Sequence, residues 1–318
     1  MSEYSYNATP LLATKDIASE NIKLLAKGKV RDIYELVDNK DYLLFIATDR
    51  ISAYDVIMKN GIPEKGKLLT QLSKFWFNDI LKDSVRNHLY IDDNDKIKEF
   101  LQIKDDAVFD SEIRDRCLIV KKHDLIPLEC IVRGYITGSG WKEYKKDGTI
   151  HGMEVLPKNK EYKQCEKLET PMFTPSTKAE QGMHDENISI EKATEILNGD
   201  VKLMKRIEDL ALELYSKAHD YALTRGIIIA DTKFEFGYDK ATDEIILVDE
   251  VLTPDSSRFW SQKTYEIGRD QDSYDKQFLR NWLTATGVAG QDGVSMPEDI
   301  VKKTFDKYKE AYEVLAKN

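Results

Sequence analysis

Two apolar runs joined by a polar turn, within residues 226–250, constrain the fold of this chain more than any other stretch. The first run, Gly-Ile-Ile-Ile-Ala at 226–230, leads into Asp-Thr-Lys-Phe-Glu-Phe-Gly at 231–237. A polar segment follows, and then Ile-Ile-Leu-Val at 245–248. Short apolar runs bounded by turn-forming residues are typical of buried strands. The pattern predicts a β-hairpin at the centre of a sheet.

Charged residues stand at alternating positions of the first predicted strand. Asp231, Lys233 and Glu235 therefore point to one face of the sheet, because side chains in a strand alternate with a period of two. Antiparallel pairing would bring Asp249 beside Glu235. Two carboxylates and an ammonium suit Mg²⁺ bound to nucleotide phosphates. The alternative is a solvated strand face with a salt bridge, but the apolar flanks favour a central strand, where unpaired charge is costly.

The composition disfavours one broad class of function. The 318 residues include 57 acidic and 47 basic side chains, which give a net charge of −10. A net negative charge repels the phosphates of nucleic acids, so a general nucleic-acid binder is disfavoured. The chain begins without a secretion-signal pattern, and no apolar run approaches membrane-spanning length. Cys117, Cys130 and Cys165 form no Cys-x-x-Cys pair, which predicts reduced thiols rather than disulfides or a zinc site. We expect a cytoplasmic protein without nucleic-acid or membrane partners.

A glycine between two lysines marks a turn at 27–34, Lys-Gly-Lys-Val-Arg-Asp-Ile-Tyr. Gly28 lets backbone N–H groups approach a phosphate, and Lys29 and Arg31 would add positive charge. The alternative is a solvated hairpin tip.

A second glycine segment, at 61–67, has the spacing of a phosphate-binding P-loop. We reject that interpretation because Leu68 stands where Ser or Thr should hold Mg²⁺, and because Pro63 interrupts the segment.

A third glycine segment, Arg-Gly-Tyr-Ile-Thr-Gly-Ser-Gly at 133–140, follows a predicted strand and leads into a predicted helix. Ser139 could cap that helix, and Gly138 and Gly140 would let the backbone wrap an anion near its positive end. Arg133 adds a charge that favours this reading over an ordinary glycine turn.

Two polar stretches are predicted to be loops. Residues 171–186 carry Lys178 and have the length of a lid, whereas His184 has no partner at metal-ligand spacing. Residues 252–260 form a polar turn that carries Asp255 and Arg258.

The remaining chain is predicted from apolar spacing. Residues 42–48 and 117–120 read as buried strands, and the highly charged segment 90–116 reads as surface loop and short helix. Helical periodicity predicts helices over 68–82, 200–224, 273–284 and 297–317, the second of them packed behind the hairpin.

Four motifs in this order resemble the SAICAR synthetase family, most closely its single-function fungal members. They lie at 28–34, 131–139, 231–237 and 249–258, and the resemblance runs from about Leu25 to the C-terminal helix. It implies an α+β fold with a sheet-rich N-terminal lobe, a central domain related to ATP-grasp enzymes and protein kinases, and C-terminal helices. We expect these regions at 1–115, 116–255 and 256–318.

The resemblance also implies a reaction. The family uses ATP to join L-aspartate to the carboxylate of carboxyaminoimidazole ribonucleotide in purine biosynthesis, releasing ADP and phosphate. An amine does not displace oxide from a carboxylate at neutral pH, so γ-phosphoryl transfer would supply the leaving group. The protein would then contribute to catalysis by positioning the substrates and neutralising charge, and no nucleophilic side chain would be needed. The motifs agree, because they contain no Ser-His or Cys-His pair.

Site residues follow from the resemblance, position by position. The implied ATP-binding residues are Gly28, Lys29, Arg31, Val120, Lys122 and Asp231, and the implied Mg²⁺ ligands are Glu235 and Asp249. Lys233, Lys178 and Asp255 fall on catalytic positions, and Arg133, Ser139, Arg258 and Arg280 on substrate-binding positions. The individual partners of Asp231, Asp255 and Arg280 stay open. Bacterial relatives have lysine where Arg31 stands, so Arg31 would bind phosphate with a fork instead of a point charge.

Two rival functions fit the ATP motifs alone. A small-molecule kinase would turn over ATP without an amino-acid requirement, and a nucleotide sensor would bind ATP without turnover. We expect small-molecule substrates as partners, and a monomer because the exposed segments are charged.

Overall fold

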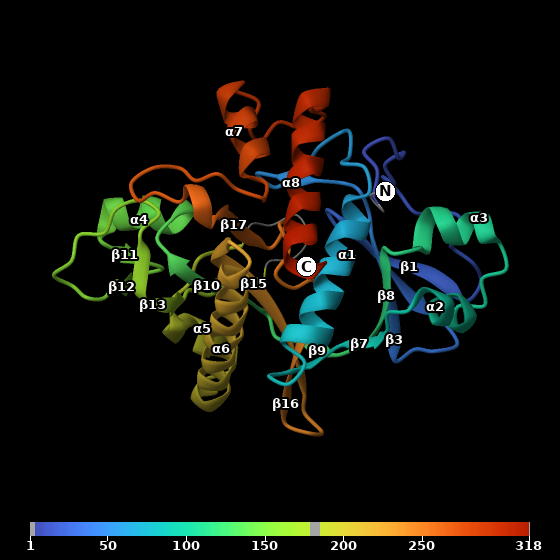
Figure 1. Cartoon of the computed structure of the whole chain (residues 1–318). Helices are drawn as coiled ribbons and strands as arrows, with labels where there is room; N and C mark the ends of the chain where they lie inside the picture. The colour runs from blue at the N-terminus through green and yellow to red at the C-terminus, as the bar shows by residue number, and fades with distance from the viewer. Residues whose placement is uncertain (1–3, 179–184, 318) are drawn as a thin grey trace.

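The computed structural model describes residues 4–178 and 185–317 of the chain (Figure 1). An antiparallel sheet comes first. It contains the predicted strands at 42–48 and 117–120 and the glycine turn at 27–34. Its order is β1 (Ile22–Lys27), β2 (Arg31–Leu36), β3 (Tyr42–Ala47), β8 (Cys117–Lys121) and β7 (Leu89–Ile91). One face is covered by α2 (Asn94–Phe100), α3 (Asp106–Val108) and the π-helical turn η2 (Phe109–Ile113).

The charged segment at 90–116 is therefore not simply surface. Ile97, Phe109 and Ile113 are fully buried against Tyr34 and Leu44 of the first sheet. The expectation of a surface loop was wrong for these apolar positions, because high average charge hid a sparse apolar face.

A second, larger sheet is built around the predicted hairpin. Its main path is β13 (Lys167–Phe173), β10 (Leu128–Tyr135), β15 (Ile227–Asp239), β16 (Glu244–Val248) and β6 (Arg86–Asn87). Off this path lie β14 (Ser176–Thr177), β17 (Ser257–Ser261) and β9 (Asp124–Leu125). Short pairs complete the strands: β4 (Ser52–Ala53) with β5 (Val56–Ile57), and β11 (Thr149–Ile150) with β12 (Met153–Glu154).

The hairpin prediction is confirmed. β15 and β16 are antiparallel with Glu235 opposite Val248, which puts Asp249, the next residue, beside Glu235. β15 also pairs with β10, β17 and β9, and it has partners on both edges at residues 231–232 and 237–238. The strand is central, as the apolar flanks indicated.

The predicted helices are present. α6 (Val201–Thr224) begins after Asp200, whose side chain accepts from the Leu203 N–H, and packs against β15 and β10. The other helices are α1 (Lys65–Phe75) with its π-helical end η1 (Trp76–Ile80), α4 (Gly138–Asp147), α5 (Ile190–Ile196), the 3₁₀ turn η3 (Gln262–Thr264), α7 (Gln277–Ala285) and α8 (Glu298–Ala316). Figure 1 shows α1 and α8 side by side between the two sheets, and their residues are in contact.

Three local predictions need correction. Ser139 does not cap α4, because the N-cap is Thr137 and makes no side-chain capping bond. The polar stretch 171–186 begins within β13 and contains β14, and the polar turn 252–260 ends in β17, so Arg258 lies on a strand. In these two polar stretches, pairing with a neighbouring strand outweighs the polar composition. The part of the predicted lid at 179–184, His184 included, lies outside the described residues.

The α+β expectation with a sheet-rich N-terminal lobe and C-terminal helices is confirmed. The division at residue 115 stays a prediction, although the first sheet continues past it through β8. Within residues 4–178 and 185–317, no helix is long and apolar enough to cross a membrane.

Candidate active site

Two carboxylates at the open end of the hairpin form the centre of the site. Glu235 lies on β15, and Asp249 follows β16 with a left-handed backbone (φ 64°), a conformation that Asp tolerates better than most residues. Burial and the neighbouring Asp249 raise the pKa of Glu235. Burial opposes ionisation of Asp249 too, but Arg31 and Lys178 outweigh it, so the pKa of Asp249 lies below its usual value. The two groups share one electrostatic environment.

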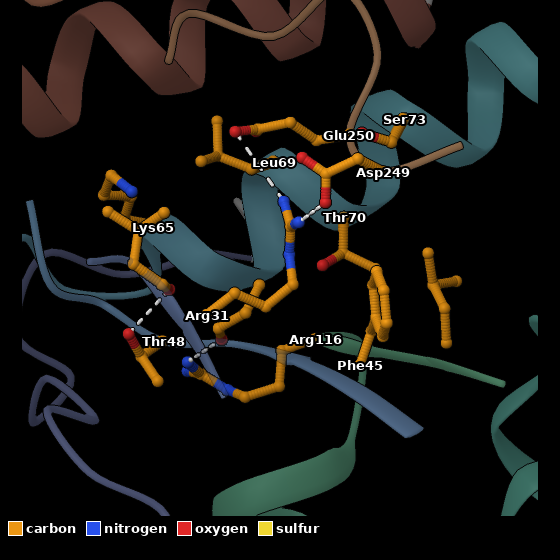
Figure 2. A pocket seen from close by; sticks show the side chains of 13 residues that line it. Arg31, Phe45, Thr48, Lys65, Leu69, Thr70, Ser73, Arg116, Asp249 and Glu250 are labelled. Atoms are coloured by element: carbon orange, nitrogen blue, oxygen red, sulfur yellow. Dashed lines mark hydrogen bonds and ion pairs between the residues drawn. The ribbon is translucent and has the colours of Figure 1, made fainter. Parts of the chain in front are cut away.

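Each charge at the hairpin has an ionic partner from another element. Arg31 of β2 pairs with Asp249 and lies 3.7 Å from Glu250, and Figure 2 shows its guanidinium between these carboxylates. Lys178 pairs with Glu235, and Lys233 pairs with Glu129 of β10. Burial alone would lower the pKa of Lys233, but Glu129 and Glu235 raise it, so the ammonium stays charged.

A small space of about 20 Å³ lies beside Arg31 (Figure 2). Thr48, Lys65 and Arg116 contribute to its polar wall, and the Arg31 guanidinium lies 5.5 Å from the centre of the Phe45 ring. A space of this size holds about one water molecule, so it is not a substrate pocket.

An apolar cavity of about 270 Å³ lies between the first sheet and the hairpin. Its walls include Leu25, Phe45, Val120 and Val248, and Glu235 and Asp249 lie at its edge. Lys122, for which ATP binding stays a prediction, also lines it. The backbone amides of Lys121 and Lys122 already donate to the carbonyls of His88 and Asp41, so these two amides are not free for a ligand. An apolar slot with a charged edge is suited to a flat heterocycle that carries an anionic tail.

A polar cavity of about 300 Å³ lies on the other side of the same carboxylates. It shares Glu235 and Asp249 with the apolar cavity. Its other charged lining residues are Lys29, Asp55, Lys233, Glu250, Asp255, Lys276 and Arg280. The predicted positions Lys29, Lys233, Asp255 and Arg280 are thus brought together with the carboxylate pair.

Asp255 is the most deeply held of these groups. Its carboxylate lies 2.7 Å from Lys65 Nζ and 3.3 Å from Lys276 Nζ, and it accepts a 2.7 Å hydrogen bond from the Tyr308 hydroxyl. Burial opposes ionisation, but the two lysines outweigh it and hold the pKa of Asp255 far below its usual range. The carboxylate is therefore ionised and fixed in the cavity wall.

Four of the remaining predicted residues form a separate cluster around Asp231 of β15. The Asp231 carboxylate lies between Arg133, at 3.5 Å, and Arg258, at 2.5 Å. Arg133 also donates to the hydroxyls of Ser139 (3.3 Å) and Thr174 (3.0 Å). Gly138, at φ 57°, leaves no room for a Cβ beside Arg258. Asp231 lines neither cavity described above, and its assignment to ATP stays a prediction.

Sequence reasoning missed several residues of the site. Lys65 and Lys276 contact Asp255, Glu129 holds Lys233, and the neutral imidazole of His88 lines the apolar cavity, its pKa lowered to about 3 by burial. Lys65 lay in the rejected P-loop segment, but nothing in the local pattern marked its contact with Asp255.

No group of three or more His, Cys, Asp or Glu side chains able to hold a metal occurs in the described part of the chain. Mg²⁺ in nucleotide sites is held by one or two carboxylates together with phosphates and water. The neighbouring carboxylates of Glu235 and Asp249 fit that donor set.

Comparisons with known proteins give a consistent result. The family model described as SAICAR synthetase matches residues 24–297. Phosphoribosylaminoimidazole-succinocarboxamide synthases from Komagataella pastoris and Saccharomyces cerevisiae are 58% and 59% identical, over 92% of this chain and 94% of each relative.

Solved structures agree with the sequence comparison. The SAICAR synthase of Saccharomyces cerevisiae, complexed with SAICAR, matches with a TM-score of 0.86 and 54% identity over 97% of this chain and 98% of that chain. A type-2 SAICAR synthetase in complex with ADP matches with a TM-score of 0.65 and 26% identity over 92% of this chain and 97% of that chain. A match of this length and identity leaves one assignment, and the chain belongs to the SAICAR synthetase family.

Proposed function

We propose that this protein is an ATP-dependent carbon–nitrogen ligase that joins L-aspartate to the carboxylate of carboxyaminoimidazole ribonucleotide, giving SAICAR, ADP and phosphate. One observation carries the proposal: an apolar cavity and a polar cavity meet at Glu235 and Asp249. Phosphoryl transfer needs a nucleotide on one side of a charged centre and an acceptor on the other. Relatives solved with SAICAR and with ADP support both halves.

The nucleotide side is assigned to the apolar cavity. The adenine would lie against Phe45, Val120 and Val248, and the triphosphate would extend past the carboxylate pair to the side of the polar cavity that Lys29 and Val30 line. Lys29 and Arg31, in and beside the glycine turn, and Lys178 supply cations along that path. The pairs that Arg31 and Lys178 make with Asp249 and Glu235 hold these side chains close to where phosphates would bind.

Glu235 and Asp249 are the residues that would hold Mg²⁺, which neutralises phosphate charge when bound. Burial and then repulsion from Asp249 raise the pKa of Glu235, and a cation between the two carboxylates would relieve that repulsion. Arg31 pairs with Asp249, and Lys178 pairs with Glu235.

The acceptor side is assigned to the polar cavity and the arginine cluster. Arg133, Ser139 and Arg258 would bind the ribonucleotide, with the Arg133 fork held by Thr174 and Asp231. Lys233 and Arg280 face the cavity where the imidazole carboxylate and aspartate would meet. Asp255 lines the wall of this cavity, where its carboxylate holds the Lys65 ammonium in place.

The chemistry follows from the need for a leaving group. A carboxylate oxygen of the imidazole nucleotide attacks the γ-phosphorus and ADP leaves, which gives an acyl phosphate. The aspartate amine then attacks the acyl carbon, phosphate leaves, and the amine proton is lost to solvent. No protein nucleophile is needed, and exclusion of water during the second step protects the acyl phosphate from hydrolysis.

Omission of each substrate in turn tests the function, and isotope transfer tests the route. With ¹⁸O in the imidazole carboxylate, label should appear in inorganic phosphate in step with amide formation. A kinase or a sensor predicts no such transfer. Amide formation at full rate with all the label retained in the nucleotide product would contradict the acyl phosphate route.

Two further expectations complete the proposal. The three cysteines are free and buried, which supports a reducing, cytosolic location. We also propose a monomer, with small-molecule substrates as its partners.

A further inference from the structure

Buried Arg50 lies directly behind the glycine turn between β1 and β2, and neither the sequence motifs nor the proposed reaction gave it a role. Its Nη2 donates to the Gly28 carbonyl at 2.9 Å and its Nε donates to the Lys29 carbonyl at 3.2 Å. The next carbonyl, of Val30, accepts from the backbone N–H and the hydroxyl of Thr48, at 3.0 and 2.8 Å. Three consecutive carbonyls of the turn are thus held from one side.

Peptide geometry then fixes where the amides point. In a trans peptide the N–H points opposite to the C=O of the same plane. The amides of Lys29, Val30 and Arg31 share planes with the three held carbonyls, so they point away from Arg50 and Thr48. Within residues 4–178 and 185–317, the amides of Lys29 and Val30 donate no hydrogen bond, and both residues line the polar cavity. Successive N–H groups that face one side form an anion-binding concavity.

Arg50 is itself locked in place. Its Nη1 donates to the Leu12 carbonyl at 2.8 Å, and its Nη2 donates to Asp32 at 2.7 Å. Asp32 in turn accepts from Thr14, and Arg50 is only 5% exposed. A planar fork that serves four acceptors in fixed directions cannot be replaced by the single ammonium of lysine.

We propose that Arg50 is a positioning residue that orients the backbone amides of the Gly28–Val30 turn toward the phosphates of ATP. This inference rests on the ATP site of the proposed function, but not on the identity of the acceptor. Arg50 acts through the turn and makes no contact with the nucleotide. Its effect should therefore depend on the phosphates and not on the base.

The test compares ligands that differ only in phosphates. In Arg50→Lys, the Kd for ATP and ADP should rise roughly tenfold, the effect of losing one charge-assisted hydrogen bond. The Kd for adenosine should stay within about twofold. Calorimetry or fluorescence titration measures all three, and thermal unfolding confirms that the variant is folded.

Two further variants sharpen the result. Thr48→Val removes one of the two bonds to the Val30 carbonyl, and it should weaken ATP binding by a smaller factor with adenosine unchanged. Glu112→Gln is the matched control. The buried Glu112 carboxylate accepts hydrogen bonds from the backbone amides of residues 15–17 in the same lobe, and it does not contact the turn. It should change ATP and adenosine binding equally or not at all.

The outcomes separate this inference from the proposed function. Equal weakening of ATP and adenosine in Arg50→Lys would assign Arg50 to the stability of the lobe, and unchanged ATP binding would remove its role. If Arg50→Lys does not fold, Thr48→Val provides the test, through the change in the Kd for ATP relative to the change in the Kd for adenosine. If the wild type binds ATP but makes no amide, the proposed function fails while the selective loss of ATP binding still supports Arg50.

Discussion

Asp249 and Asp255 line the same polar cavity only a few residues apart, yet their surroundings differ. The side chain of Asp249 is 27% exposed and pairs with Arg31, which reaches it from the first sheet. The side chain of Asp255 is 2% exposed and pairs with Lys65, which is fully buried. A carboxylate with an accessible partner can exchange that partner for a ligand. A carboxylate with buried partners fixes the structure around it.

The elements that supply the partners strengthen the contrast. Lys65 opens α1, Lys276 immediately precedes α7, and Tyr308 lies in α8, so Asp255 ties three helices to the cavity wall. The Asp249 carboxylate pairs with Arg31 of β2 and so links the hairpin to the first sheet. We infer that Asp255 is chiefly needed for stability and Asp249 for ligand binding.

The largest expected effect is on Asp255→Asn. Removal of its charge leaves Lys65 and Lys276 buried without an anion, which should lower the free energy of unfolding by roughly 3–5 kcal/mol. Urea denaturation measures this loss. Tyr308→Phe, which removes one hydrogen bond to the same carboxylate, is the control and should cost only about 1 kcal/mol. If Asp255→Asn were as stable as the wild type, the contrast between the two carboxylates would be lost.

Asp249→Asn should behave in the opposite way. The free energy of unfolding should change by no more than about 1 kcal/mol, because the side chain is partly exposed. Turnover should fall about a hundredfold, as expected when a carboxylate that binds Mg²⁺ loses its charge. Steady-state rates at saturating Mg²⁺ measure this. Asp243→Asn, on the exposed turn of the same hairpin, is the matched control and should keep full activity. Turnover of Asp249→Asn within threefold of wild type would remove Asp249 from the metal site.

Substitution of Arg133 tests whether this buried cation binds ligand, as proposed for Asp249, or stabilises the fold, as proposed for Asp255. It is buried like Asp255, but the sequence motifs assign it to substrate. Arg133→Ala should raise the KM for the ribonucleotide roughly tenfold or more, the effect of losing a charged hydrogen bond, and leave the KM for ATP within about twofold. Initial-rate kinetics with each substrate varied in turn measure both constants. Equal rises would instead class Arg133 with Asp255 as a structural residue.

The smallest effect is the pH dependence of the Asp255 contribution. Its pKa is lower in the folded state than its ordinary value of 3.8, so the ionised group stabilises the fold above that pH, and this stability is lost as the pH falls toward the folded pKa. The difference in unfolding free energy between wild type and Asp255→Asn should therefore shrink below pH 4, by at most about 1.4 kcal/mol per pH unit. Denaturation at pH 5, 4 and 3 measures it. A difference that stayed constant or grew would show that the charge of Asp255 is not what stabilises the helices.

Local pattern predicted the parts of the fold that depend on local physics. Alternation of side chains identified the hairpin and placed Asp231, Lys233 and Glu235 on one face, and helical periodicity found α6 and α8. It failed where pairing with a distant strand competed with composition, as in β17. It also failed at Ser139, because α4 begins at Gly138 with Thr137 as its N-cap, two residues earlier than a cap at Ser139 requires.

The sequence by itself determined the family and the hairpin, and it predicted which residue types would face ATP, because motifs and periodicity are carried by neighbouring residues. Only the tertiary structure decided which charges meet. The pairs Lys65 with Asp255, Arg31 with Asp249 and Lys178 with Glu235 join segments far apart in the chain. Only the packing of those segments decides which cation each carboxylate faces, and how buried the pair is. For the same reason, the role proposed for Arg50 depends on its hydrogen bonds to the carbonyls of Gly28 and Lys29, which only the tertiary structure brings close to it.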